Sequence, residues 1–211
     1  MSTYARATRI QFPPDGLDRA ISHFKEVTVP AAKALAGFAG TVMMVNRSTG
    51  DCGAVTFWDS RDNLKASEQA GTQLRTQAAS AAGGDVVDVR RYEVVLREMA
   101  GPPTSGTSVR VNVGQAAPEK LDTLTQRMRD EALPTVRGLR GFRALNLSID
   151  RDTGGFAIIS VWDTPADREA SFAGIQDMRT RLFADINAEN VDVTEYETVY
   201  VEFAAVAATA E

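Results

Sequence analysis

The sequence contains very little of the chemistry that disulfide and metal sites require. Among 211 residues there is one cysteine, Cys52, and one histidine, His23. A single cysteine excludes an internal disulfide and is typical of proteins from a reducing compartment. Two such residues are also too few for an ordinary zinc site. We therefore expect a cytoplasmic protein with no bound metal.

Long apolar runs and an excess of positive charge are missing as well. No stretch approaches the roughly 18 apolar residues of a membrane-spanning helix, and residues 1–6 lack the apolar core of a signal peptide. The chain has 23 Lys and Arg against 28 Asp and Glu, a formal net charge of -5. Because a nucleic-acid surface needs clustered basic residues, we expect neither nucleic acid nor membrane as a partner.

The most informative feature of the sequence is a repeat of itself at an offset of 104 residues. Residues 6–98 align without a gap to residues 110–202, and 25 of the 93 pairs are identical. A period this long exceeds the roughly 20–50 residues of a solenoid unit, so each copy is expected to be a domain. The predicted organisation is a first repeat over 1–99, a linker over 100–106, a second repeat over 107–204 and a flexible tail over 205–211.

Each repeat has the pattern strand, helix, strand, strand, helix, strand. Three valines alternate with Arg110 and Asn112, which is the period of a strand, and Thr164 and Pro165 are typical of a helix start. Glycine in 46–51 and in 150–155 indicates hairpin turns. The predicted elements are 5–12, 16–35, 38–46, 53–59, 60–81 and 86–98, then 108–113, 118–137, 142–149, 156–162, 164–185 and 191–203.

The order βαββαβ is the ferredoxin-like arrangement, with both helices on one face of an antiparallel sheet. The other face of that sheet must be covered. We therefore predict an α+β protein in which two tandem ferredoxin-like repeats turn their sheets toward each other. They would close an eight-stranded barrel as an intramolecular dimer. A monomer is the expected state, and further homo-oligomers stay open.

These motifs resemble the antibiotic biosynthesis monooxygenase (ABM) domain. The resemblance rests on Gly37-Phe38 at the start of a strand, a hairpin with glycine, and the segment VTFWDS at 55–60 leading into a helix. Residues 141–142 and 160–164 repeat it. The resemblance implies the dimeric α+β barrel superfamily. It also implies a cofactor-independent monooxygenase that acts on a polycyclic phenol or a similar small aromatic molecule.

Two other functions stay open beside the monooxygenase. One is a non-catalytic barrel protein that binds a small molecule, and the other is haem binding and degradation, which also occurs in this family. In the haem-degrading members an axial histidine lies on the second helix, after the tryptophan. Neither 60–81 nor 164–186 contains a histidine, which counts against haem.

Four residues of the first repeat are candidates for catalysis: Trp58, His23, Arg6 and Tyr92. The resemblance implies that Trp58 lines a pocket between sheet and helices, although an indole there also anchors a strand to a helix. His23 either deprotonates a phenol or is an ordinary helix residue. Tyr92 either donates a hydrogen bond to substrate or packs within its strand. His23 favours the first repeat as the active half.

Four residues of the second repeat are candidates for substrate binding: Trp162, Arg110, Asn112 and Tyr196. Arg6 and Arg110 occupy equal places on the first strands, and with Asn112 they are predicted to point away from the helices into the barrel. A charge buried there needs a partner, for which Glu93, Glu98, Glu197 and Glu202 are candidates. These residues form either ion pairs between the repeats or the lining of a site for an anionic or phenolic ligand.

Overall fold

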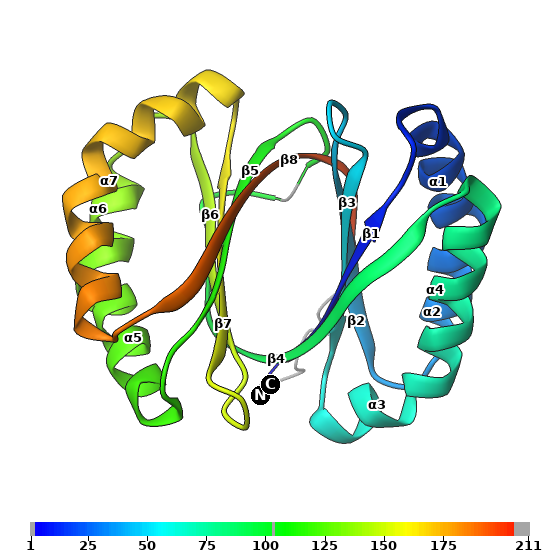
Figure 1. Ribbon diagram of the computed structural model, residues 1–211, viewed down its shortest axis with the longest axis horizontal. Coiled ribbons are helices and arrows are strands. Elements are labelled where there is room, and N and C mark those ends of the chain that lie inside the picture. Colours follow the sequence, from blue (N-terminus) through cyan, green and yellow to red (C-terminus); the bar gives the residue numbers. More distant parts are fainter. Residues whose placement is uncertain (1–2, 103, 205–211) are drawn as a thin grey trace, which may run out of the picture.

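The eight predicted strands close into one barrel in the protein's computed structural model, which describes residues 3–102 and 104–204 (Figure 1). The strand order is β1-β3-β2-β8-β5-β7-β6-β4, and β4 closes the barrel by pairing with β1. The strands are β1 (Thr3–Gln11), β2 (Phe38–Asn46), β3 (Asp51–Trp58), β4 (Asp85–Met99), β5 (Ser108–Gln115), β6 (Phe142–Ile149), β7 (Gly155–Trp162) and β8 (Glu189–Phe203). The tail predicted over 205–211 lies outside the described residues.

The helices of the two repeats cover opposite outer sides of the barrel (Figure 1). The first repeat has α1 (Leu17–His23), α2 (Val29–Lys33), α3 (Arg61–Ala66) and α4 (Glu68–Ala82), and the second has α5 (Leu121–Arg127), α6 (Leu133–Arg137) and α7 (Pro165–Asp185). None of the helices in the described part of the chain is long and apolar enough to cross a bilayer.

The long last strand of each repeat joins the two sheets. β4 pairs with β1 of its own repeat from Asp85 to Val94 and with β6 of the other repeat from Glu93 to Met99. β8 does the same with β5 and β2. Each strand thus crosses from its own sheet to the other, so neither sheet keeps a free edge. The predicted intramolecular dimer of two ferredoxin-like repeats is confirmed.

The first helix of each repeat contains a π-helical turn that the sequence pattern did not predict. The turns are Phe24–Thr28 and Met128–Ala132, and in each repeat a proline follows two residues later, Pro30 or Pro134. Proline has no N–H to donate to the carbonyl four residues back, and its ring clashes with that carbonyl. The wider turn lets the helix continue through the proline, and it is a frequent feature of functional sites.

The second helix of the first repeat is broken, whereas α7 is continuous. Ser60 and Thr164 cap α3 and α7, since each side chain accepts a hydrogen bond from the N–H three residues on. Between α3 and α4 the chain turns at Ser67, where the carbonyl of Leu64 accepts a hydrogen bond from Arg6 instead of continuing the helix. The predicted single helix over 60–81 is therefore two helices.

Apolar side chains form three clusters, one under the helices of each repeat and one inside the barrel. The second repeat's cluster is the largest and draws Ile175, Met178 and Phe183 of α7 against the sheet. On α4 the buried residues are the small Ala79 and Ala82. The two repeats therefore share a backbone plan but pack their second helices differently.

Candidate functional site

A cavity of about 70 Å³ lies between the sheet and the helices of the first repeat. Its walls come from β1, β3, the π-helical turn and α4, and most of the lining is apolar. Its polar side chains are those of Arg6, Thr8, Thr28, Thr56 and Arg75. We refer to this space as the first-repeat cavity.

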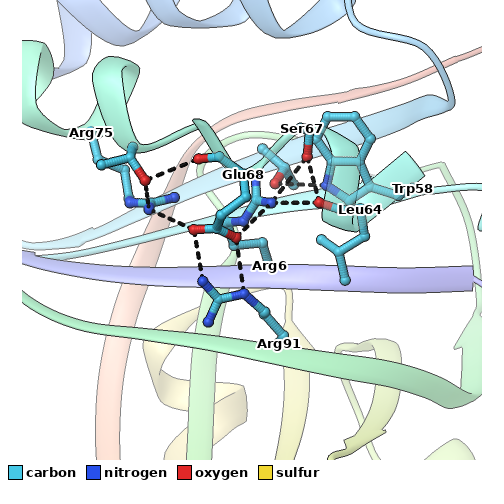
Figure 2. A network of polar contacts seen from close by, with 9 residues as sticks. Arg6, Trp58, Leu64, Ser67, Glu68, Arg75 and Arg91 are labelled. Atoms are coloured by element: carbon cyan, nitrogen blue, oxygen red, sulfur yellow. Dashed lines mark hydrogen bonds and ion pairs between the residues drawn. The ribbon is translucent and has the colours of Figure 1, made fainter. Parts of the chain in front are cut away.

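Arg6 reaches this cavity from β1 and is almost fully buried, with 4% of its side chain exposed. Its Nη2 donates to the carbonyl of Leu64 at 2.7 Å, to Ser67 Oγ at 3.0 Å and to Glu68 Oε2 at 3.1 Å (Figure 2). The guanidinium lies at the end of α3, where a helix favours positive charge. Arg6 therefore points toward the helices, and the prediction that it points into the barrel is wrong.

Glu68 is the one carboxylate within a group of three guanidinium groups. Its oxygens lie 3.1 Å from Arg6, 3.1 Å from Arg75 and 2.7 Å from Arg91 (Figure 2). Partial burial works to raise the pKa of Glu68, but hydrogen bonds from Arg91 and Arg75 and the charge of Arg6 hold it below its ordinary value. Three positive charges against one negative leave this cluster with an excess of positive charge beside the cavity.

Three buried polar atoms that belong to the cavity lining have no hydrogen-bond partner among residues 3–102 and 104–204. They are Arg6 Nε, Arg75 Nη1 and Thr28 Oγ1. A buried polar group without a partner costs about 1–3 kcal/mol, so native proteins rarely keep such groups without a reason. Two guanidinium donors and one hydroxyl at a single cavity suit a ligand that carries a negatively charged oxygen.

Gly71 of α4 gives Arg6 and Arg75 the space they occupy. A β-carbon at this position would lie 2.5 Å from Arg6 Nη1 and 3.2 Å from Arg75 Nη1. The residue at the same place in the second repeat is Ile175, which packs into that repeat's core. The absence of a side chain at Gly71 is therefore a local requirement of the first-repeat site.

Trp58 contributes its ring to the cavity and uses its indole N–H within its own strand. The N–H donates to Thr56 Oγ1 at 3.2 Å, and the ring packs edge-on against Phe38. Arg6 lies 5.7 Å from the ring centroid, within cation–π range. With its N–H engaged, Trp58 offers a ligand the face or edge of the ring.

Trp162 repeats this arrangement, donating to Ser160 Oγ at 3.1 Å and packing against Phe142. Because the same contacts occur in both repeats, they support an anchoring role for the two tryptophans.

The second repeat has larger apolar side chains at two positions of the corresponding space, Phe172 and Ile175. Phe172 stands where the first repeat has Glu68, and it lies under the Arg110 guanidinium at 5.3 Å. Arg110 pairs with Glu195 at 3.3 Å, and Asn112 accepts a hydrogen bond from Arg179 of α7 at 3.2 Å. Arg110 and Asn112 thus face the helices, which corrects the prediction that they face the barrel.

The acidic partners predicted for the two arginines are also wrong. Glu93 pairs with Arg151, Glu197 with Arg47, Glu98 with Arg137 and Glu202 with Lys33. The partners of Arg6 and Arg110 are Glu68 and Glu195 instead, because both arginines point to the helix side of the sheet.

His23, Tyr92 and Tyr196 do not join the first-repeat cavity. His23 ends α1 and is half-buried, and its neighbour Phe24 lines the cavity in its place. Tyr92 and Tyr196 lie on the barrel side of the sheet, where Tyr196 belongs to the interior cluster. The structure therefore brings together only Arg6 and Trp58 of the four catalytic candidates.

The described residues that line the cavity include no carboxylate, histidine, tyrosine or lysine. Chemistry in this cavity therefore has no side-chain proton acceptor in direct contact with the ligand. The two arginines supply electrostatic stabilisation of an anion, which is a different way of promoting ionisation.

Sequence reasoning missed Arg75, Arg91, Thr28 and Gly71. The sequence holds one indication of Arg75, because the residue 104 places later, Arg179, is identical. On the same helix Glu68 is replaced by Phe172, which shows that the two repeats differ there. Arg91 and Thr28 carry no such mark, since each is replaced in the second repeat.

Comparison with known proteins establishes the fold. No protein-family model matches the chain. The uncharacterized protein Rv2558 of Mycobacterium tuberculosis H37Rv is 27% identical over 195 residues, covering 92% of this chain and 82% of that protein. A "Putative monooxygenase" of Fusobacterium nucleatum superposes with a TM-score of 0.72 at 12% identity, covering 96% of this chain and 94% of the other.

Two further solved structures show how varied the neighbours are. An anthrone oxidase-like protein has a TM-score of 0.68 at 14% identity, covering 95% of this chain and 93% of its own. A heme-degrading enzyme of Listeria monocytogenes has a TM-score of 0.51 at 12% identity, covering 91% and 98%. The chain thus has the dimeric α+β barrel fold of ABM-like proteins, with both halves of the barrel in one polypeptide.

Proposed function

We propose that the first-repeat cavity binds the anion of a small aromatic phenol or enol and that the protein oxygenates it without a cofactor. The observation that carries this proposal is the buried Arg6, which lines the cavity and whose Nε has no protein partner among the described residues. An oxygenase of this kind must hold its substrate as an anion, because the ionised form gives up electrons to O₂.

The arginines would promote that ionisation. Positive charge within a few ångströms lowers the pKa of a bound phenol, and two arginines would have to outweigh the burial of the phenol, which raises its pKa. Because the lining offers no side-chain base, the proton would leave to solvent as the substrate binds. One oxygen atom of O₂ then enters the substrate and the other leaves as water with two substrate hydrogens, as when an anthrone becomes an anthraquinone. The substrate supplies all the electrons, so no external reductant is needed.

The size of the cavity limits the substrate. An engineered cavity of about 150 Å³ admits benzene, and the first-repeat cavity has a volume of about 70 Å³. An aromatic ring therefore requires an outward movement of a wall. We propose that α4 moves, since the residues it buries are the small Ala79 and Ala82, and small side chains hold a helix with little buried area.

Oxygen consumption tests the proposal. We expect the protein to accelerate O₂ uptake by an anthrone above the spontaneous rate, and Arg6→Met to abolish the acceleration. Arg110→Met is the matched control, because it removes the equivalent arginine from the second repeat, where it packs on Phe172 and pairs with Glu195. A rate at the spontaneous level with several phenols of one to three rings, or equal loss in both variants, would contradict the proposal.

The second candidate function is binding without catalysis. The lack of a proton acceptor in the lining and the small volume favour it. It predicts that a phenolate binds to the wild-type protein and not to Arg6→Met, with no O₂ uptake in either. Calorimetric titration beside the oxygen electrode separates the two candidates.

Haem is a poor match for this site. The single histidine lies outside the cavity lining, and helices α3, α4 and α7 contain none. Titration with haemin is expected to produce no shift of the Soret band, and a saturable shift would revive this function.

We also propose that the protein works as a cytoplasmic monomer. One chain supplies both halves of the barrel, and its single thiol is buried. Light scattering after size exclusion is expected to give a mass near 22.8 kDa, and a larger mass would show further assembly.

A further inference from the structure

Tyr92 and Tyr196 occupy equal places in the two repeats but have different surroundings. The Tyr196 hydroxyl donates to Asp51 Oδ2 at 3.0 Å, and Arg9 Nε donates to Asp51 Oδ1 at 2.9 Å. Asp51 is buried at 3% exposure, so its carboxylate is held by a phenol and a guanidinium at the barrel wall.

The second repeat has no carboxylate at the position equivalent to Asp51. The residue 104 places after Asp51 is Gly155, and the one after Arg9 is Val113. The Tyr92 hydroxyl is buried, in a residue that is 4% exposed, and it has no hydrogen-bond partner in the part of the chain that the structure describes. A β-carbon at Gly155 would lie 4.0 Å from Cε1 of the Tyr92 ring. Tyr92 thus lies next to Gly155, whereas Tyr196 lies next to the equivalent residue Asp51 and donates to its carboxylate.

Tyr92 and Gly155 both line an open groove of about 820 Å³ between the repeats. Five basic residues line it against three acidic ones: Arg61, Lys65, Arg90, Arg91 and Arg151, with Glu93, Asp150 and Asp152. The acids are already engaged. Arg61 pairs with Asp152 and Arg151 with Glu93, while Asp150 accepts hydrogen bonds within its own turn.

Burial raises the pKa of Tyr92, the neighbouring Arg90 acts to lower it, and the charges of Asp88 and Asp150 add smaller effects that raise it. The guanidinium of Arg90 also pairs with Asp88 through Nε. Arg90 and Tyr92 are thus a guanidinium and a buried phenol side by side, as are Arg9 and Tyr196, which hold Asp51 on the other side of the barrel.

We propose that this groove binds a small organic carboxylate that takes, beside Tyr92, the position that the Asp51 side chain takes beside Tyr196. The ligand oxygen accepts a hydrogen bond from the Tyr92 hydroxyl and pairs with Arg90. This site is separate from the first-repeat cavity, because Tyr92 lies on the barrel side of the sheet and Arg6 on the helix side. It does not depend on the oxygenase proposal.

Binding of 4-fluorobenzoate, followed by fluorine NMR and calorimetry on the full chain, tests the site. Wild type is expected to bind it saturably, and the neutral 4-fluorobenzyl alcohol is expected not to bind. Tyr92→Phe should weaken binding about tenfold or more, as expected for the loss of one hydrogen bond to a charged group. Gly155→Asp should abolish it, because the new carboxylate supplies the missing partner from within.

Controls separate this site from the first-repeat cavity. Thr28→Val removes an unpartnered hydroxyl from the lining of that cavity and should leave benzoate binding at Tyr92 unchanged. Gly155→Asn introduces similar bulk without charge, and it should weaken binding less than Gly155→Asp. Gly155 has no positive φ, and the nearest atom to an added β-carbon is Thr153 Oγ1 at 3.3 Å, so both changes require the same small shift of the Thr153 side chain.

Three results would overturn the inference: no saturable binding by wild type, unchanged affinity in Tyr92→Phe, or a loss of affinity in Thr28→Val as large as that expected in Tyr92→Phe. If Gly155→Asp fails to fold, Tyr92→Phe decides the question by itself. It removes a single hydroxyl that has no protein partner among the described residues.

Discussion

Gly71 and Arg6 approach each other so closely that a β-carbon on Gly71 would lie 2.5 Å from Arg6 Nη1. This contact joins α4 to β1 at the wall of the first-repeat cavity. It makes the glycine a requirement of the arginine, although glycine in the middle of a helix is unfavourable in itself. Substitution of Gly71 therefore measures how much folding stability the protein gives up to keep Arg6 in this position.

Gly71→Ala is expected to gain less stability than an ordinary helix substitution. Alanine is favoured over glycine in a helix by about 1 kcal/mol, and at Gly174 of α7, where an added β-carbon meets Leu139 at an ordinary 3.4 Å, that gain should appear. At Gly71 the displacement of Arg6 should cancel it. Urea unfolding of Gly71→Ala and Gly174→Ala makes the comparison, and equal gains would show that Arg6 moves freely.

Arg6→Met is expected to lower the free energy of unfolding by about 1–3 kcal/mol, the range for a buried group that loses its hydrogen bonds. The substitution removes the donor to Leu64, Ser67 and Glu68. Arg6→Lys should not restore ligand binding, because one ammonium cannot serve the Leu64–Glu68 contacts and the cavity together. Full activity in Arg6→Lys would show that charge alone suffices.

The stability contributed by Glu68 should depend on pH. Its pKa in the folded protein is lowered by the surrounding arginines against the opposing effect of burial. A lowered carboxyl pKa contributes stability above the unfolded-state pKa of about 4.3, and this contribution is lost as pH falls through the folded-state pKa. Glu68→Gln should therefore be less stable than wild type at pH 7, and the difference should shrink below about pH 4. A pH-independent difference in thermal melting would contradict this.

The two tyrosines of the barrel are expected to differ in what their hydroxyls contribute. Tyr196→Phe takes a donor from the buried Asp51, so we expect a loss of about 1–3 kcal/mol. Tyr92→Phe removes a hydroxyl with no partner in the described residues, so stability should stay the same or rise slightly. Parallel denaturant titrations measure both, and equal losses would show that Tyr92 has a partner in solution.

Cys52 should be unreactive in the folded protein. It follows the buried Asp51 in β3 and is 2% exposed, and burial together with the charge of Asp51 raises its pKa to about 12. Since the thiolate is the reactive form, a thiol reagent should label the protein only after unfolding. Rapid labelling of the native protein would show that β3 opens locally.

The sequence by itself determined the architecture. The sequence aligns to itself without a gap at one offset, with identical pairs such as Trp58 and Trp162, and this alignment predicts two copies of one βαββαβ unit. An antiparallel sheet with helices on one face has to bury the other, so the closed barrel followed. The two hairpin turns can also be predicted from the sequence, because the positive φ of Gly50 and Gly154 is a local property of the chain.

Only the tertiary structure decided where the chemistry lies. Alternation along β1 and β5 separates two faces but does not say which face meets the helices, and the assignment for Arg6, Arg110 and Asn112 came out reversed. The arginine cluster combines residues 6, 68, 75 and 91, whose contact depends on how α4 crosses the sheet. The difference between Tyr92 and Tyr196 likewise depends on which residue of β3 or β7 stands opposite. Local patterns fix periodicity, but a site depends on contacts between segments that meet only after folding.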